Sequence, residues 1–154
     1  MKTLSRSALV GVVAASLAWA AALSVYAQVK RPYRDGSVWN ISMIHVKPGM
    51  SSAYLNYLAT DWKRNQEAAK KEGLILSYKV LVTEGHSPND WDLLLMTESK
   101  DLATMEASTD KADALVQKLI GDDQKQMQGY KDRSEIREVM GTRLAREIVL
   151  EPKP

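Results

Sequence analysis

The chain has 154 residues, with 21 basic and 19 acidic side chains and no cysteine. The absence of cysteine excludes disulfides, thiol catalysis, cysteine-bound zinc, iron–sulfur clusters and a lipid-modified N-terminal cysteine. A formal net charge of +2 gives no electrostatic case for binding nucleic acid or an anionic membrane.

Residues 1–27 have the three parts of a secretory signal peptide. Lys2 and Arg6 make the start basic, and residues 8–23 are apolar except for one serine. Residues 25–27 (Val-Tyr-Ala) then end on a small side chain, as a signal peptidase requires. We therefore expect the protein to be exported, to the periplasm or to the outside of the cell.

The alternative for this segment is an uncleaved membrane anchor. Residues 8–27 approach the ~20 residues that a spanning helix needs. The segment is rich in alanine and only weakly hydrophobic, which favours cleavage. We expect the cut after Ala27, with Ala22 as the second choice, and no membrane anchor afterwards.

Cleavage leaves 127 of the 154 residues, the size of one domain. Because the signal segment holds two basic residues and no acidic one, the mature chain has 19 of each and no net charge. The predicted organisation is a linker over residues 28–36, one domain over residues 37–150 and a polar tail over residues 151–154.

Hydrophobic periodicity predicts four strands and two main helices. Alternation with β-branched and aromatic residues places the strands at residues 37–46, 74–83, 91–97 and 142–150. Apolar residues at three- and four-residue steps place the helices at residues 50–72 and 99–121.

The second predicted helix has Ser99 as its expected N-cap, with a break at Ser108-Thr109-Asp110. Residues 122–130 fit neither pattern. Asp132 and Glu135 have the spacing of a capping box, which predicts a short helix ending at Gly141.

The order strand-helix-strand-strand-helix-strand predicts an α+β, ferredoxin-like fold with a four-stranded antiparallel sheet and both helices on one face. The strands are apolar on both faces: Ile41 and Met43 alternate with Ile44 and Val46. A sheet of this kind needs a cover on both faces. We expect a second copy of the chain to be that cover, in a homodimer, with Ile44 on the face that the copy covers.

This pattern resembles the dimeric α+β barrel superfamily, whose members include antibiotic-biosynthesis-monooxygenase-like, EthD-like and NIPSNAP-like proteins. The resemblance spans roughly residues 38–150. It lies in a first strand ending at Lys47-Pro48-Gly49-Met50, a long helix with Tyr54, Tyr57 and Trp62, and a following strand hairpin. It implies a dimeric barrel with a ligand cleft between sheet and helices, and it assigns no single family.

His45 is the candidate catalytic residue. If its strand face, shared with Trp39, looks at the long helix, His45 lies near Tyr54, Tyr57 or Trp62, where it can act as acid, base or metal ligand. The alternative is a half-exposed histidine at a strand end. His86, in a turn, is expected at the surface.

No metal and no cofactor are expected. The two histidines have no metal-site spacing, and neither predicted helix holds a histidine that could ligate heme.

A set of mainly aromatic side chains forms the candidate ligand pocket. These residues are Trp39, Tyr54, Tyr57, Asp61, Trp62 and Tyr78. Asn65 lies on the same helical stripe and offers an amide to a ligand. The alternative for the aromatic residues is core packing, and for Asp61 an ion pair at the helix edge.

Two functions remain open from the sequence. The first is an exported, dimeric binding or interaction protein for a small apolar or aromatic ligand, because no catalytic motif is present. The second is a cofactor-independent enzyme, a monooxygenase or isomerase acting on an apolar small molecule. It follows from the resemblance and from His45 beside aromatic residues.

The signal prediction is tested by N-terminal sequencing of the exported protein. We expect the mature chain to begin at Gln28, because cleavage follows Ala27. A membrane-bound product that still begins at Met1 would contradict cleavage.

Overall fold

A computed structural model describes residues 31–84, 87 and 90–151 of the chain. The signal segment, His86, the first three linker residues and the last three residues of the tail lie outside the described residues. The described residues fall into two compact units, a larger one over Asp35–Val149 and a smaller one that holds residues 31–34, 150 and 151. Within the described part of the smaller unit, the Arg34 guanidinium lies 2.9 Å from the Glu151 carboxylate.

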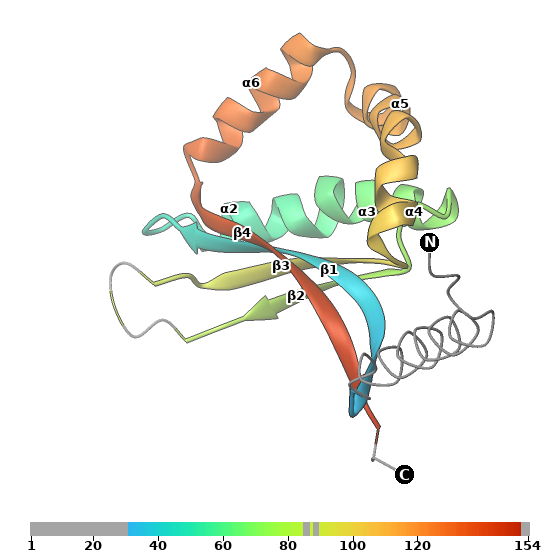
Figure 1. Cartoon of the computed structure of the whole chain (residues 1–154). Helices are drawn as coiled ribbons and strands as arrows, with labels where there is room; N and C mark the ends of the chain where they lie inside the picture. The colour runs from blue at the N-terminus through green and yellow to red at the C-terminus, as the bar shows by residue number, and fades with distance from the viewer. Residues whose placement is uncertain (1–30, 85–86, 88–89, 152–154) are drawn as a thin grey trace, which may run out of the picture. The chain divides into compact units, whose positions relative to one another are not determined.

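The larger unit has the predicted α+β fold (Figure 1). Its four strands lie in the order β2-β3-β1-β4. They are β1 (Tyr33–Val46), β2 (Ser77–Val82), β3 (Leu93–Ser99) and β4 (Arg137–Leu150). The helices are α2 (Ser51–Tyr57), the π-helical η2 (Leu58–Trp62), α3 (Lys63–Lys71), α4 (Leu102–Ala107), α5 (Thr109–Ile120) and α6 (Asp123–Ser134).

The sheet is antiparallel throughout. β3 pairs antiparallel with β1, for example Ile41 with Met96, and with β2 on its other side. Between β1 and β4, Ser37 contacts Glu147 and Ser42 contacts Thr142. Residue numbers therefore rise along β1 as they fall along β4, so these two strands are antiparallel as well. This order and these directions confirm the ferredoxin-like fold predicted from the sequence.

The α2–η2–α3 segment forms the long helix that periodicity predicted at residues 50–72. It ends where Gly73 takes a positive φ of 70°. There the Gly73 and Leu74 N–H groups donate to the carbonyls of Lys70 and Ala69. A left-handed glycine is the usual way to satisfy the last carbonyls of a helix.

Several expected boundaries were wrong at the ends of the domain. β1 begins at Tyr33, so residues 33–36 belong to the sheet and not to a linker. β4 begins at Arg137 rather than at residue 142. The two strands are neighbours in the sheet. Because they pair with each other, each strand is longer than its own sequence pattern predicts.

The predicted caps of the later helices were also wrong. Ser99 is the last residue of β3, and the Asp101 carboxylate caps α4 by accepting the Thr104 N–H at 2.6 Å. That hydrogen bond lowers the pKa of Asp101. The residues that fitted no pattern open α6, which Asp122 caps through the Lys125 N–H at 3.0 Å. Asp132 therefore lies inside a helix and starts no new one.

All described helices lie on one side of the sheet (Figure 1). Tyr54 and Leu58, from α2 and η2, pack against Ile44 of β1 and Leu93 of β3 in the core cluster. Because side chains alternate along a strand, burial of Ile44 directs His45 to the opposite face. The expectation that Ile44 lies on the face for a second copy is wrong: Ile44 is 1% exposed beneath the helices.

Tyr54 provides a stability test because its buried hydroxyl has no hydrogen-bond partner among the described residues. Burial raises the pKa of Tyr54 from 10.0 to about 12. The folded value lies above the unfolded one, so stability from the neutral hydroxyl is complete below pH 10.0 and falls as pH rises toward about 12. We expect Tyr54→Phe to flatten this alkaline loss in denaturant unfolding. An equally steep loss in both proteins would contradict the assignment.

Candidate functional site

A pocket of about 440 Å³ lies between the helices and the covered face of the sheet. Its floor comes from β1 and β3, and its walls come from α3, α4, α5 and the segment before β2. The lining residues are Asn40, Asn65, Gln66, Ala69, Leu74, Ile75, Thr97, Ser99, Met105, Ser108, Ala112, Leu115, Val116, Leu119 and Ile120. Its volume and its mainly apolar lining are typical of small-molecule sites.

The apolar wall of the pocket is the face of α5. Ala112, Leu115, Leu119 and Ile120 recur at helical spacing, the periodicity that predicted this helix. Ile120 remains 37% exposed. Other residues therefore cover the apolar face of α5 only in part, and the pocket lies against the part that is left uncovered.

A lysine ties the two long helices together at one end. Lys111 of α5 donates from Nζ to the Glu72 carbonyl, 2.7 Å away, just after the end of α3. The Glu72 carboxylate lies 3.5 Å from the same nitrogen. Since α3 and α5 both line the pocket, this contact joins two of its walls at one end.

The polar groups in the pocket differ in their bonding. Thr97 donates to the Gln66 Oε1 atom at 3.3 Å, and Ser108 donates to the Thr104 carbonyl at 2.7 Å. The Asn65 Oδ1 atom is buried and has no hydrogen-bond partner among the described residues. A buried acceptor without a donor costs free energy. A ligand that donates a hydrogen bond to Asn65 Oδ1 would remove this cost and so gain binding free energy.

The candidate aromatic residues lie elsewhere. Tyr54 is fully buried and stacks on Tyr57, with 5.9 Å between ring centroids. Trp62 packs edge-on against Tyr78 at 5.3 Å, and the hydrogen bond from Tyr78 to Glu67 raises the pKa of the Tyr78 hydroxyl. These side chains pack in two pairs and do not line the 440 Å³ pocket. Their role in ligand binding stays a prediction.

The other two candidates are also outside this pocket. Asp61 is exposed and pairs with Arg64 at 2.9 Å along the helix. Trp39 lies on the sheet face without helices, where the Lys79 ammonium sits 5.0 Å from its ring centroid. Asn65, which the sequence offered as an amide for a ligand, does line the pocket.

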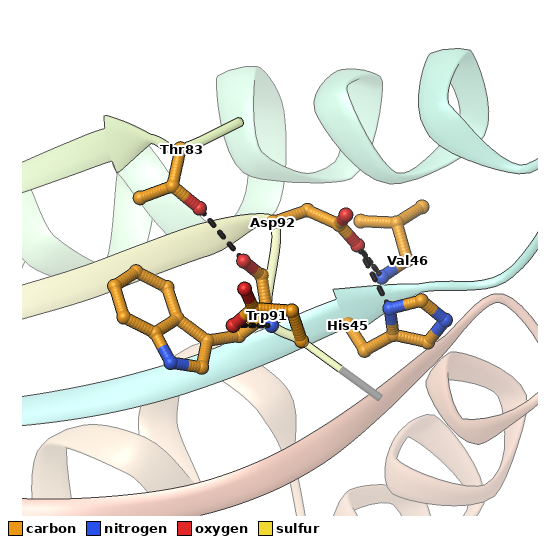
Figure 2. Close-up of polar contacts among 6 residues, drawn as sticks. His45, Val46, Thr83, Trp91 and Asp92 are labelled. Carbon is orange, nitrogen blue, oxygen red and sulfur yellow. Dashed lines mark hydrogen bonds and ion pairs between the residues drawn. The ribbon is translucent and has the colours of Figure 1, made fainter. Parts of the chain in front are cut away.

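His45 stands beside a residue that the sequence did not single out, Asp92 (Figure 2). The His45 Nδ1 atom lies 3.1 Å from Asp92 Oδ2. The same oxygen accepts the Val46 N–H at 2.6 Å. The strand register explains the meeting: Ile44 pairs with Leu93, so the next pair along the antiparallel ladder is His45 with Asp92.

The strand end around this pair is held by backbone contacts. The Asp92 N–H donates to the Ile44 carbonyl at 2.8 Å, and the Thr83 N–H donates to the Asp92 carbonyl at 2.7 Å. The Thr83 hydroxyl donates to the Trp91 carbonyl at 2.7 Å. His45 is thus a partly exposed residue on the helix-free face, separate from the aromatic cluster around Tyr54.

No metal centre is evident in the part of the chain that the structure describes. Groups of three or more histidine or acidic side chains in metal-binding proximity are absent there. Among the same residues, no helix combines the length and the apolar character needed to cross a membrane.

The fold and the pocket define a class of protein, a small α+β domain with ferredoxin-like topology and one helix-covered sheet face. A search of solved structures found similarity to a NIPSNAP family protein of unknown function from Agrobacterium tumefaciens. The two chains are 15% identical, with a TM-score of 0.46 over 77% of this chain and 93% of the other. No family model and no curated protein matches the sequence.

Proposed function

We propose that the protein binds a small, mainly apolar and uncharged ligand in the pocket between α3, α5 and the sheet. The observation that carries the proposal is the lining: aliphatic walls with a buried acceptor, Asn65 Oδ1, that has no hydrogen-bond partner among the described residues. A ligand with a hydroxyl or amide N–H would satisfy that acceptor while its apolar body lies against α5.

Binding is favoured over chemistry at this pocket because of its side chains. The lining residues carry amides, hydroxyls and aliphatic groups, with no ionisable side chain among them. Such groups hold and orient a ligand, but they do not exchange protons near neutral pH.

A pocket-filling substitution tests the ligand site. Ala112 lines the pocket and Ala114, on the same helix, is exposed and does not. We expect Ala112→Phe to weaken binding of an apolar fluorescent probe at least about tenfold, because the new ring occupies the ligand volume. The matched control Ala114→Phe should bind as the wild type does. Equal binding by both variants would refute the site.

We also propose that the helix-free face of the sheet is covered by a second copy of the chain. Support comes from the apolar residues of that face. They are Trp39, Ile41, Met43, Leu81, Leu94 and Met96, which adjoin one another across three strands. Soluble monomers rarely leave such a continuous apolar surface in water. The predicted mature chain has no net charge, so no net electrostatic repulsion opposes self-association.

Gly141 of β4 lies next to Met43 of β1 on this face. A Cβ atom built on Gly141 would lie 3.3 Å from the Met43 Cε atom. The glycine thus leaves room for Met43 to lie along the neighbouring strand. An apolar sheet face of this kind suits packing of one sheet on another.

The dimer is tested by placing a charge on this face. We expect Met96→Lys to shift the protein to the monomer mass in light scattering, because a buried lysine would be left without a partner. Met127→Lys, at a 60% exposed position on α6, is the control and should leave the mass unchanged. A soluble wild-type monomer at micromolar concentration would overturn the proposal.

Export to the periplasm or the outside of the cell completes the proposed role. It rests on the basic, apolar and small-residue sections of residues 1–27. Binding an apolar molecule outside the cytoplasm is a task that a domain without cysteine can perform regardless of the redox state of its surroundings.

The second candidate function is a cofactor-independent monooxygenase or isomerase, and the contact between His45 and Asp92 favours it. The Asp92 carboxylate lies 3.1 Å from Nδ1, although the geometry does not make a hydrogen bond. Nε2 is the ring nitrogen left to act as a base. If the protein converts an apolar small molecule, His45→Gln should abolish turnover and leave the melting temperature nearly unchanged. Full activity of this variant would eliminate His45 as the base.

A further inference from the structure

A second, smaller pocket lies where α6 ends and β4 begins. Its volume is about 240 Å³, and it is separate from the pocket beside α5. The residues around it are Lys47, Tyr130, Ser134, Arg137, Glu138 and Val139. Two of these carry a positive charge and one a negative charge, so the lining has a net charge of +1.

Arg137 is held in place without a carboxylate partner. Its guanidinium carbon lies 5.8 Å from the ring centroid of the buried Tyr54, and its Nε atom is buried with no hydrogen-bond partner among the described residues. Three other arginines, Arg34, Arg64 and Arg146, each have a carboxylate oxygen within 3.1 Å. A buried donor of a charged group costs free energy when it has no partner, so an anion at Arg137 would be favourable.

Lys47, which directly follows β1, supplies the second cation. Its backbone N–H donates to the Ile136 carbonyl at 3.1 Å, which fixes the residue next to Arg137. No ion pair holds its ammonium group within the described part of the chain. A guanidinium and an ammonium therefore border one small pocket, and neither is neutralised by an ion pair.

We propose that this pocket binds the carboxylate group of a small organic acid. The planar guanidinium of Arg137 matches two carboxylate oxygens, and Lys47 adds a point charge. The net charge of +1 suits a singly charged group better than a phosphate dianion. Tyr130 and Val139, which are 57% and 37% exposed, offer apolar surface to the body of the acid.

Butyrate and its neutral isostere butyramide provide a direct test by calorimetry or NMR titration of the purified protein. We expect saturable binding of butyrate and at least about tenfold weaker binding of butyramide, because only the acid forms charge-assisted hydrogen bonds. Equal binding of the two probes, or tighter binding of inorganic phosphate than of butyrate, would overturn the assignment.

Variants locate the site. Lys47→Gln and Arg137→Gln should each weaken butyrate binding about tenfold, while Lys70→Gln on the exposed end of α3 should leave it unchanged. Arg137 also contacts Tyr54, so its variant needs a check of folding by circular dichroism. If Arg137→Gln fails to fold, Lys47→Gln decides alone, because the Lys47 side chain is exposed. Wild-type affinity in Lys47→Gln would refute the site.

Discussion

The packing of Tyr54 and Leu58 against Ile44 and Leu93 determines how the two faces of the sheet are used. These four residues form the buried cluster, at most 5% exposed. Because strand side chains alternate, burying Ile44 places its neighbours Met43 and His45 on the other side. One set of contacts thereby separates a helix-covered face with a pocket from a helix-free apolar face.

The order of the elements could be predicted because the hydrophobic periodicity of each helix and strand was clear. The face of the sheet that the helices cover could not be predicted. Ile41 and Met43 are as apolar as Ile44 and Val46, so alternation leaves two solutions. Polar residues made the choice harder, since Asn40 and Ser42 share a face with Ile44 and look like the residues of an exposed surface. In the structure Asn40 lies on the helix-covered face, where it lines the pocket and is not packed in the core.

The candidate site shows the same limit of local sequence. Tyr54, Tyr57, Trp62 and Tyr78 are the bulky side chains of the long helix and its neighbouring strand, and they pack with one another. Space for a ligand remains where side chains are small, at Ala69 and Ala112, and small residues carry little signal in a periodicity analysis. Asp92 was missed for another reason: it meets His45 only through the register of β1 and β3.

The helix-covered pocket and the strand-end pocket differ in the electrostatic character of their linings, so the ligands proposed for them differ as well. In the first, the unmet group is the Asn65 acceptor among aliphatic side chains, and an anion there would face a carbonyl dipole and lose its hydration. In the second, the unmet group is the Arg137 cation, and a neutral molecule would leave it uncompensated. Leaving a buried polar group unpaired costs about 1–3 kcal/mol, and more for a charged group. If both proposals hold, each pocket would reject the ligand class that suits the other. One small domain would then discriminate between neutral and acidic molecules, because the two linings share no residue.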